Sequence, residues 1–227
     1  LEDKFFEDYE DNHQRTNVKN YPPYFLGSII LVDKNQQTFV IDGQQRLTSL
    51  TLLLIYIYRK FGDNDQKQNL LNLIYSDTFG EKNFNLNIDD RTECLEKLMN
   101  EGAYETKEDD NESVKNLVDR YEDIENNFSE KLTNVLPLFA DWLKEKVFFV
   151  EITAQNDQDA YNIFETMNDR GLSLNSSEML KGYLLSQIDS EDKRNDANNK
   201  WKNVVIKLKN EDKDHEEEFA KSLLRAR

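Results

Sequence analysis

The sequence predicts a helix-rich α+β fold, and three observations point to this class. The chain of 227 residues contains only 7 Gly and 3 Pro, whereas average usage is roughly 7% and 5%, so long uninterrupted elements are expected. Aromatic residues make up 11% of the chain, which is enough for a packed core although 33% of the residues are charged. Two segments rich in aromatic and β-branched residues predict strands within an otherwise helical pattern.

The first part of the chain predicts a helix, a β-hairpin and a second, buried helix. Aromatic residues at helical spacing within residues 2–12 indicate an amphipathic helix. Residues 24–32 and 38–41 are β-prone runs joined by a short polar turn, which predicts a hairpin. Residues 44–61 are expected to form one helix. Its stretch 50–58 is apolar nearly all round, which indicates burial on several sides.

The remaining chain is expected to add one strand to this sheet and to surround it with helices. Residues 146–153 strongly predict a strand, which is expected to join the sheet formed by the hairpin. This sheet is expected to pack on helix 44–61. Residues 84–88 carry a weaker strand signal. Helices are expected at residues 91–102, 112–128, 136–144, 157–168, 196–208 and 216–225. The predicted domains are a core of 1–61 plus 146–190, a helical insertion of 62–145 and a C-terminal helical region of 191–227.

Composition and charge exclude several classes of function. With 29 Lys+Arg and 45 Asp+Glu, the net charge is 29 − 45 = −16, which argues against a protein that wraps DNA with a basic face. Cys94 is the only cysteine and the 2 histidines lie far apart, so no disulfide, cysteine-based zinc site or HNH-type nuclease site is expected. No apolar run approaches the ~18 residues that cross a bilayer, and the first residues lack a signal-peptide pattern. We therefore expect a cytoplasmic protein without a membrane partner, and the missing initiator Met indicates a fragment of a longer one.

A strand, a glycine turn and a buried helix follow one another directly in the segment VIDGQQRLT, and this junction predicts an anion site. The first N–H groups of the helix and its positive end converge there, which suits a phosphate. Gly43 permits a tight turn and a close approach of ligand, and Arg46 adds a fork for phosphate oxygens. Asp42 is placed to hold a metal-bound water or a ribose hydroxyl, and Gln44 and Gln45 to orient water. An ordinary strand–helix junction with a solvated Arg46 is the alternative that spacing leaves open.

A second polar cluster follows in the segment IFETMNDRGLSL. Here a helix ends in Asn168, Asp169, Arg170 and Gly171, and the next helix carries Lys181. Asn168, Arg170 and Lys181 form a polar set beside apolar anchors. Spacing alone favours a simple helix–turn–helix elbow with Gly171 in the left-handed region.

The segments YFLGSI (24–29) and IDGQQRLT (41–48), followed by FETMNDRGLSL (164–174) and MLK (179–181), resemble the N-terminal domain of GmrSD-type modification-dependent restriction enzymes. The resemblance covers most of the chain, and the DGQQR box is highly specific to that family. It implies a ParB/sulfiredoxin-like mixed sheet, with a helical insertion and a helical C-terminal region, that binds and hydrolyses nucleoside triphosphates with Mg²⁺. The catalytic residues implied are Asp42, Gln44 and Gln45, and the cofactor-binding residues are Gly43, Arg46, Thr48, Asn168, Arg170 and Lys181.

The resemblance also implies the setting of this activity. The chain is expected to be a nucleotide-binding, NTP-hydrolysing regulatory module of a modification-dependent restriction or phage-defence protein of bacteria. DNA is reached through the full-length protein, whose cutting activity resides in a C-terminal HNH-type nuclease domain or subunit. The family's opening box, I-P-x-Y-Q-R-x-Y-x-W, has no counterpart in residues 1–23.

Two other functions remain open at this stage. A ParB-like DNA-binding or nuclease module would need a basic face, and a helical interaction scaffold would use DGQQR only as a turn. We expect the chain alone to leave DNA intact. We also expect Asn168, Arg170 and Lys181 to converge near residues 43–46 if both boxes serve one pocket.

Overall fold

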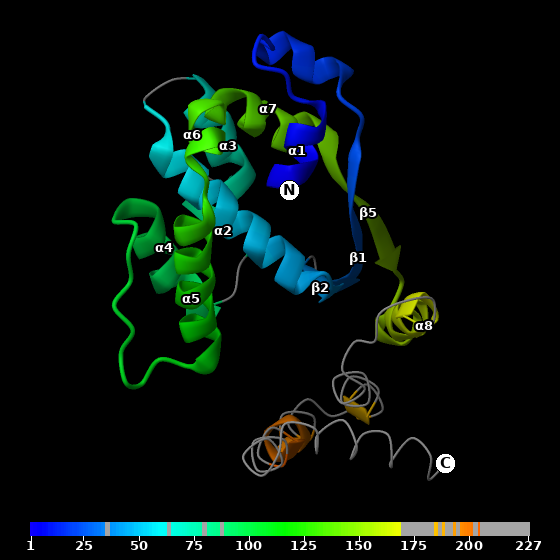
Figure 1. Cartoon of the computed structure of the whole chain (residues 1–227). Helices are drawn as coiled ribbons and strands as arrows, with labels where there is room; N and C mark the ends of the chain where they lie inside the picture. The colour runs from blue at the N-terminus through cyan, green and yellow to red at the C-terminus, as the bar shows by residue number, and fades with distance from the viewer. Residues whose placement is uncertain are drawn as a thin grey trace. The chain divides into compact units, whose positions relative to one another are not determined.

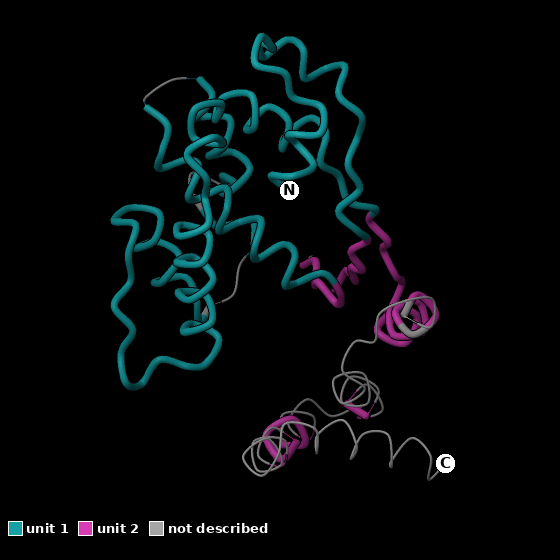
Figure 2. The backbone as a smooth tube through the Cα atoms, viewed as in Figure 1, with its two compact units in different colours: residues 1–27, 43–150 teal, residues 28–42, 151–227 magenta. Residues whose placement is uncertain are grey.

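The computed structural model describes residues 1–34, 37–62, 65–78, 81–86 and 89–168, and beyond these residues 184, 185, 188, 193, 196–201 and 204. The chain divides into two compact units, shown in teal and magenta in Figure 2. Unit 1 contains residues 1–27 and 43–150, and unit 2 contains residues 28–42 and 151–227. The predicted domain boundaries at 61, 145 and 190 stay a prediction.

Unit 1 is mainly helical, and its longest helix, α2 (Gln44–Lys60), packs against three others, α3, α4 and α5. Figure 1 shows these elements. Besides α2, unit 1 contains the helices α1 (Glu2–Asp8), η1 (Arg15–Asn20), α3 (Asp65–Ile74), η2 (Asp89–Arg91), α4 (Thr92–Asn100), α5 (Glu112–Asn127), α6 (Glu130–Asn134) and α7 (Leu136–Lys146) and the hairpin β3 (Tyr75–Thr78) with β4 (Glu81–Phe84).

The core of unit 1 forms because α2 is apolar on most of its surface and needs helices around it. Leu52, Ile55 and Ile57 of α2 are fully buried. A second part of the same core is aromatic: Trp142 of α7 is 1% exposed and stacks on Phe139 at 5.8 Å, with Phe5 of α1 edge-on at 5.8 Å from Trp142. Burial of such rings stabilises a fold by several kcal/mol, since truncating one to Ala costs about 3–5 kcal/mol.

One three-stranded sheet is formed by β1 (Tyr24–Lys34), β2 (Gln37–Asp42) and β5 (Val147–Ala154), in the order β2-β1-β5. The pairing of β1 with β2 is antiparallel and the register shifts between Ile30 and Leu31. The predicted hairpin and the return of the third strand to its sheet are therefore confirmed. With this small sheet and many helices, the predicted α+β class is confirmed as well.

Unit 2 is built around α8 (Asp157–Asn168), which runs along one face of β1. Side chains of a strand alternate between faces, so Ser28, Ile30, Val32 and Lys34 share a face. Lys34 forms an ion pair with Asp157 at the start of α8, and Ser28 contacts Met167 near its end. Between these contacts lies a small core, whose buried members are Ile30, Val32, Ala154 and Ala160.

The expectation that the sheet packs on helix 44–61 stays a prediction. The apolar residues of α2 belong to the helical cluster of unit 1, against which Tyr24 of β1 and Val147 of β5 also pack, whereas Ile30 and Val32 belong to the small core of unit 2. Ala160 is fully buried, and its small side chain lets α8 approach the strand closely. Asn156 begins α8 with a reciprocal cap, because its Oδ1 accepts from Asp159 N at 2.9 Å and its Nδ2 donates to Asp159 Oδ2 at 2.8 Å.

Most predicted elements are confirmed, and one strand prediction is wrong. Residues 84–88 were expected to form a strand, but β4 ends at Phe84 and pairs with β3 upstream. The helices α3 and α6 were not expected. Of the turn and helix predicted between residues 169 and 187, only residues 184 and 185 are described, and both are helical. The predicted helix 216–225 lies outside the described residues, while 196–201 are helical. No helix in the described part of the chain has the length and apolar character needed to cross a membrane.

Candidate functional site

The predicted strand–turn–helix junction is present at the start of α2. β2 ends at Asp42, Gly43 follows with φ 94° and ψ 2°, and α2 begins at Gln44. The left-handed conformation of Gly43 is one that residues with a Cβ rarely adopt. The first hydrogen bond of the helix runs from Leu47 N to Gly43 O at 3.0 Å. The N-cap residue of α2, Gly43, has no side chain that could cap this end, and the N–H groups of a first helical turn have no intrahelical acceptor.

Arg46 lies directly against the backbone of Gly27 in β1. A Cβ placed on Gly27 would overlap the Arg46 guanidinium, with Nη1 as the nearest atom. Gly27 also has φ +123°, a conformation that favours glycine, and a Cβ there would displace the end of the Arg46 side chain. Within unit 1 this contact joins Gly27 of the segment YFLGSI to Arg46 of the segment IDGQQRLT.

The other residues predicted at this junction differ in exposure. Gln44 and Gln45 are exposed, and Asp42 and Arg46 are half-buried. Thr48, which is one turn inside the helix, is 8% exposed and is the one buried polar residue among the described residues. Water can therefore reach Gln44 and Gln45, which the predicted role in positioning a water molecule requires. Thr48, in contrast, is largely covered by protein.

A second arginine approaches the same helix from α5, and the sequence did not indicate it. Arg120 Nη1 donates to Ser49 Oγ at 3.1 Å and to the carbonyl of Gln45 at 3.5 Å. Ser49 Oγ also donates to Gln45 O at 2.8 Å. Arg120 lies 75 residues from Gln45, and no spacing pattern relates residues so far apart. This contact connects α5, which lies in the predicted insertion, to Gln45 and Ser49 of α2.

The second predicted cluster is described only at its beginning. Asn168 is the last residue of α8, and its side chain, like Arg170 and Lys181, lies outside the described residues. Their convergence on the α2 junction stays a prediction. Within unit 2, Ser28 Oγ donates to Met167 Sδ at 4.0 Å, so the end of α8 lies beside Ser28 of β1.

Metal binding at the junction would rest on few protein ligands. Across the described ranges, no group of three His, Cys, Asp or Glu residues is arranged to hold a metal ion. Asp42 is the carboxylate nearest in sequence to the start of α2. Mg²⁺ usually takes one or two protein carboxylates and completes its shell with water and substrate phosphates. The single carboxylate of Asp42 would suit a Mg²⁺ ion that binds together with a phosphate ligand. It would not suit a metal site in which the protein supplies every ligand.

Comparison with known proteins relates these features to one family. The family described as the GmrSD restriction endonuclease, N-terminal domain, matches residues 3–185. The match covers 183 of the 227 residues, since 185 − 3 + 1 = 183. It spans the sheet, α2 with its junction, and the segment after α8. No curated protein matches the chain significantly.

Proposed function

The chain belongs to the family of GmrSD restriction endonuclease N-terminal domains, a module associated with restriction enzymes, and from this premise we propose that it binds a nucleoside triphosphate at the start of α2. In this proposal the module reports nucleotide occupancy to the nuclease part of a modification-dependent restriction or phage-defence protein. The observation that carries the proposal is the junction of Gly43 and Arg46, in which a helix that begins after a left-handed glycine has in its first turn an arginine that lies against Gly27.

The junction has the chemistry that a triphosphate requires. A 17-residue helix presents its positive end and its first N–H groups, and the left-handed Gly43 lets a phosphate come close to the backbone. Arg46 supplies a planar fork for two phosphate oxygens. The net charge of −16 repels an anion at long range, so binding depends on these local donors.

The remaining predicted residues have separate roles in this proposal. Asp42 would hold Mg²⁺ together with the phosphates, and the ion when bound neutralises phosphate charge. Gln44 and Gln45, both exposed, orient the water that attacks the terminal phosphate, while Arg120 keeps Gln45 in place through its carbonyl. Thr48, Asn168, Arg170 and Lys181 are the further residues assigned to the nucleotide site.

The partners follow from the family and from the charge of the chain. We propose that DNA is contacted and cut by other parts of the full-length protein, such as an HNH-type nuclease domain or subunit, because an acidic module repels a duplex. Under this proposal the chain acts in the cytoplasm, where both triphosphates and invading DNA are found. The chain by itself leaves plasmid DNA intact with Mg²⁺ and a triphosphate.

Titration calorimetry with the four ribonucleoside triphosphates in the presence of Mg²⁺ tests the proposal. Arg46→Ala is expected to weaken binding by about 1.5–3 kcal/mol, because charged hydrogen bonds to phosphate are lost. Lys60→Ala removes the same charge at the other end of α2, roughly 21 Å from Arg46 at 1.5 Å per residue, and should leave binding unchanged. If Arg46→Ala and wild type bind with equal affinity, the phosphate site is not here.

Phosphate release distinguishes binding from hydrolysis. Gln44→Ala and Gln45→Ala should still bind a triphosphate but release less phosphate than wild type. Binding without any phosphate release in wild type would leave a nucleotide sensor without catalysis. Neither binding nor release would favour the helical scaffold, and DNA nicking that is lost in Asp42→Ala would favour the ParB-like nuclease.

A further inference from the structure

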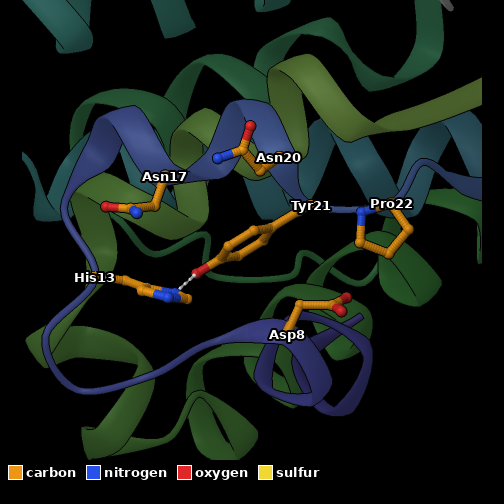
Figure 3. A pocket seen from close by; sticks show the side chains of 6 residues that line it. All are labelled: Asp8, His13, Asn17, Asn20, Tyr21 and Pro22. Carbon is orange, nitrogen blue, oxygen red and sulfur yellow. Dashed lines mark hydrogen bonds between the residues drawn. The ribbon is translucent and has the colours of Figure 1, made fainter.

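A pocket of about 190 Å³ lies between the end of α1 and the residues around η1, and it shares no residue with the α2 junction (Figure 3). Pockets for drug-sized ligands usually measure ~300–1,000 Å³, so this one suits a smaller molecule. It is lined by Asp8, His13, Asn17, Asn20, Tyr21 and Pro22.

The hydrogen bonds of His13 determine what Tyr21 offers to a ligand. His13 Nδ1 accepts from the backbone N–H of Glu10 at 3.2 Å, so this nitrogen carries no proton. Tyr21 Oη lies 2.7 Å from the same nitrogen and must therefore be the donor in that bond. The lone pairs of Tyr21 Oη are left to accept hydrogen bonds. Figure 3 shows this pair, with Asp8 to one side of the Tyr21 ring.

The segment that ends at the pocket is strongly negative, whereas η1 on the other side contains Lys19 and Arg15, of which Arg15 is paired with Asp141. Residues 2–11 contain six carboxylates and one lysine, and that lysine, Lys4, is paired with Glu7 at 2.7 Å. No lysine or arginine lines the pocket. Burial raises the pKa of Tyr21, and the nearby Tyr9, Asp8 and Glu10 raise it further. The hydroxyl therefore stays neutral, and an anionic ligand would be repelled.

Aromatic rings add a second feature that favours a cation. Tyr21 is buried but lines the pocket, and Tyr9 meets the His13 ring edge-on at 6.2 Å. A cation near the face of such a ring is attracted by its quadrupole. Carboxylate, phenol oxygen and ring together match a group that carries a positive charge and several N–H donors.

We propose that this pocket binds a small organic cation through a primary ammonium group. The Asp8 carboxylate balances the charge, Tyr21 Oη accepts one N–H, and the side-chain oxygen of Asn20 is available for another. Asn17 Oδ1 is already engaged by Gln14 N at 2.8 Å, so Asn17 is expected to contribute less. A quaternary ammonium has no N–H and would leave these acceptors unpaired.

Calorimetry of the 227-residue chain with putrescine, at constant ionic strength, tests the proposal. Wild type is expected to bind one putrescine saturably, and Asp8→Asn to weaken binding by about tenfold or more, since a charged hydrogen bond is lost. Asp11→Asn is the matched control: it removes one negative charge from an exposed residue outside the pocket and should change the affinity less than about twofold. Tyr21→Phe keeps the ring and should weaken binding by roughly threefold.

Three results would overturn the proposal. Wild type without saturable binding has no such site. Equal losses in Asp8→Asn and Asp11→Asn would mean that putrescine responds only to the overall acidity of the N-terminal segment. Tetramethylammonium that binds as tightly as putrescine would contradict the role of the hydrogen-bond acceptors. Circular dichroism of each variant checks folding, and Arg46→Ala should bind putrescine normally, because the two sites are separate.

Discussion

Replacing Gly27 by Ala tests the contact that joins β1 to the start of α2. Gly27 has φ +123°, and the Arg46 guanidinium occupies the space of a Cβ. A left-handed conformation costs a residue with a Cβ about 1–3 kcal/mol. The displaced Arg46 adds an interaction energy, which for residues in contact is about 0.5–3 kcal/mol. We therefore expect Gly27→Ala to lower the free energy of unfolding by the sum of the two, about 1.5–6 kcal/mol.

A double-mutant cycle separates these two contributions. In an Arg46→Ala background the guanidinium that a Gly27 Cβ would meet is absent, so Gly27→Ala should cost only the backbone contribution of about 1–3 kcal/mol. The measurement is urea unfolding followed by circular dichroism for wild type, both single variants and the double variant. Equal costs of Gly27→Ala in the two backgrounds, within about 0.5 kcal/mol, would refute the contact between Arg46 and Gly27.

Gly62 provides the matched control for this cycle. Its φ is not in the left-handed region, and a Cβ there would meet nothing within 4 Å. Gly62→Ala should therefore be neutral or slightly stabilising, by up to about 1 kcal/mol, because it restricts the unfolded chain. A large loss of stability from Gly62→Ala would show that glycine replacement is costly in this chain for reasons other than conformation and space.

Two further predictions concern α4. Arg59 donates to Met99 O at 3.2 Å and to Glu101 O at 2.8 Å. Arg59→Ala should therefore lower the free energy of unfolding, measured in urea, by about 1–2 kcal/mol. Arg59→Lys should recover only part of this loss, because lysine lacks the planar fork of the guanidinium. Burial raises the pKa of Cys94 to about 11, above the pKa of the thiol in the unfolded chain. The folded state therefore favours the neutral thiol. This contribution to the free energy of unfolding is fully present below the unfolded pKa and is lost as the pH rises through 11. The urea midpoint should thus fall at alkaline pH by the equivalent of about 2–3 kcal/mol. Cys94→Ala has no thiol to titrate and should show a smaller fall. An identical fall in both proteins would contradict ionisation of Cys94 as the cause.

The sequence predicted the elements whose signals are local. The hairpin, the third strand and the helix Asp157–Asn168 were all expected where the structure has them, because alternation and helical spacing lie within one segment. The strand expected at 84–88 was wrong since a run as short as FNLNI carries too little pattern to locate a strand. In the structure the pairing of Phe84 with Tyr75 decides where β4 lies.

The candidate site was predictable to the extent that it is continuous in sequence. Asp42, Gly43 and Arg46 are neighbours in the chain, and a strand followed by glycine and a buried helix is sufficient to predict an exposed helix start. The supporting contacts were not predictable. Gly27 lies 19 residues before Arg46, and Arg120 follows Gln45 by 75 residues, so no periodic pattern connects them.

By itself the sequence determined the α+β class, the helical core around α2 and the position of the strand–glycine–helix junction at which we propose phosphate binding. These depend on backbone preference and on apolar periodicity, which act over a few residues. Only the tertiary structure decided that α8 covers β1, that Gly27 receives the Arg46 side chain and that Tyr21 donates to His13. Each of these is a contact between segments whose local sequences are compatible with many partners. The choice among them is made by packing, in which shape, volume and hydrogen bonds must be satisfied together.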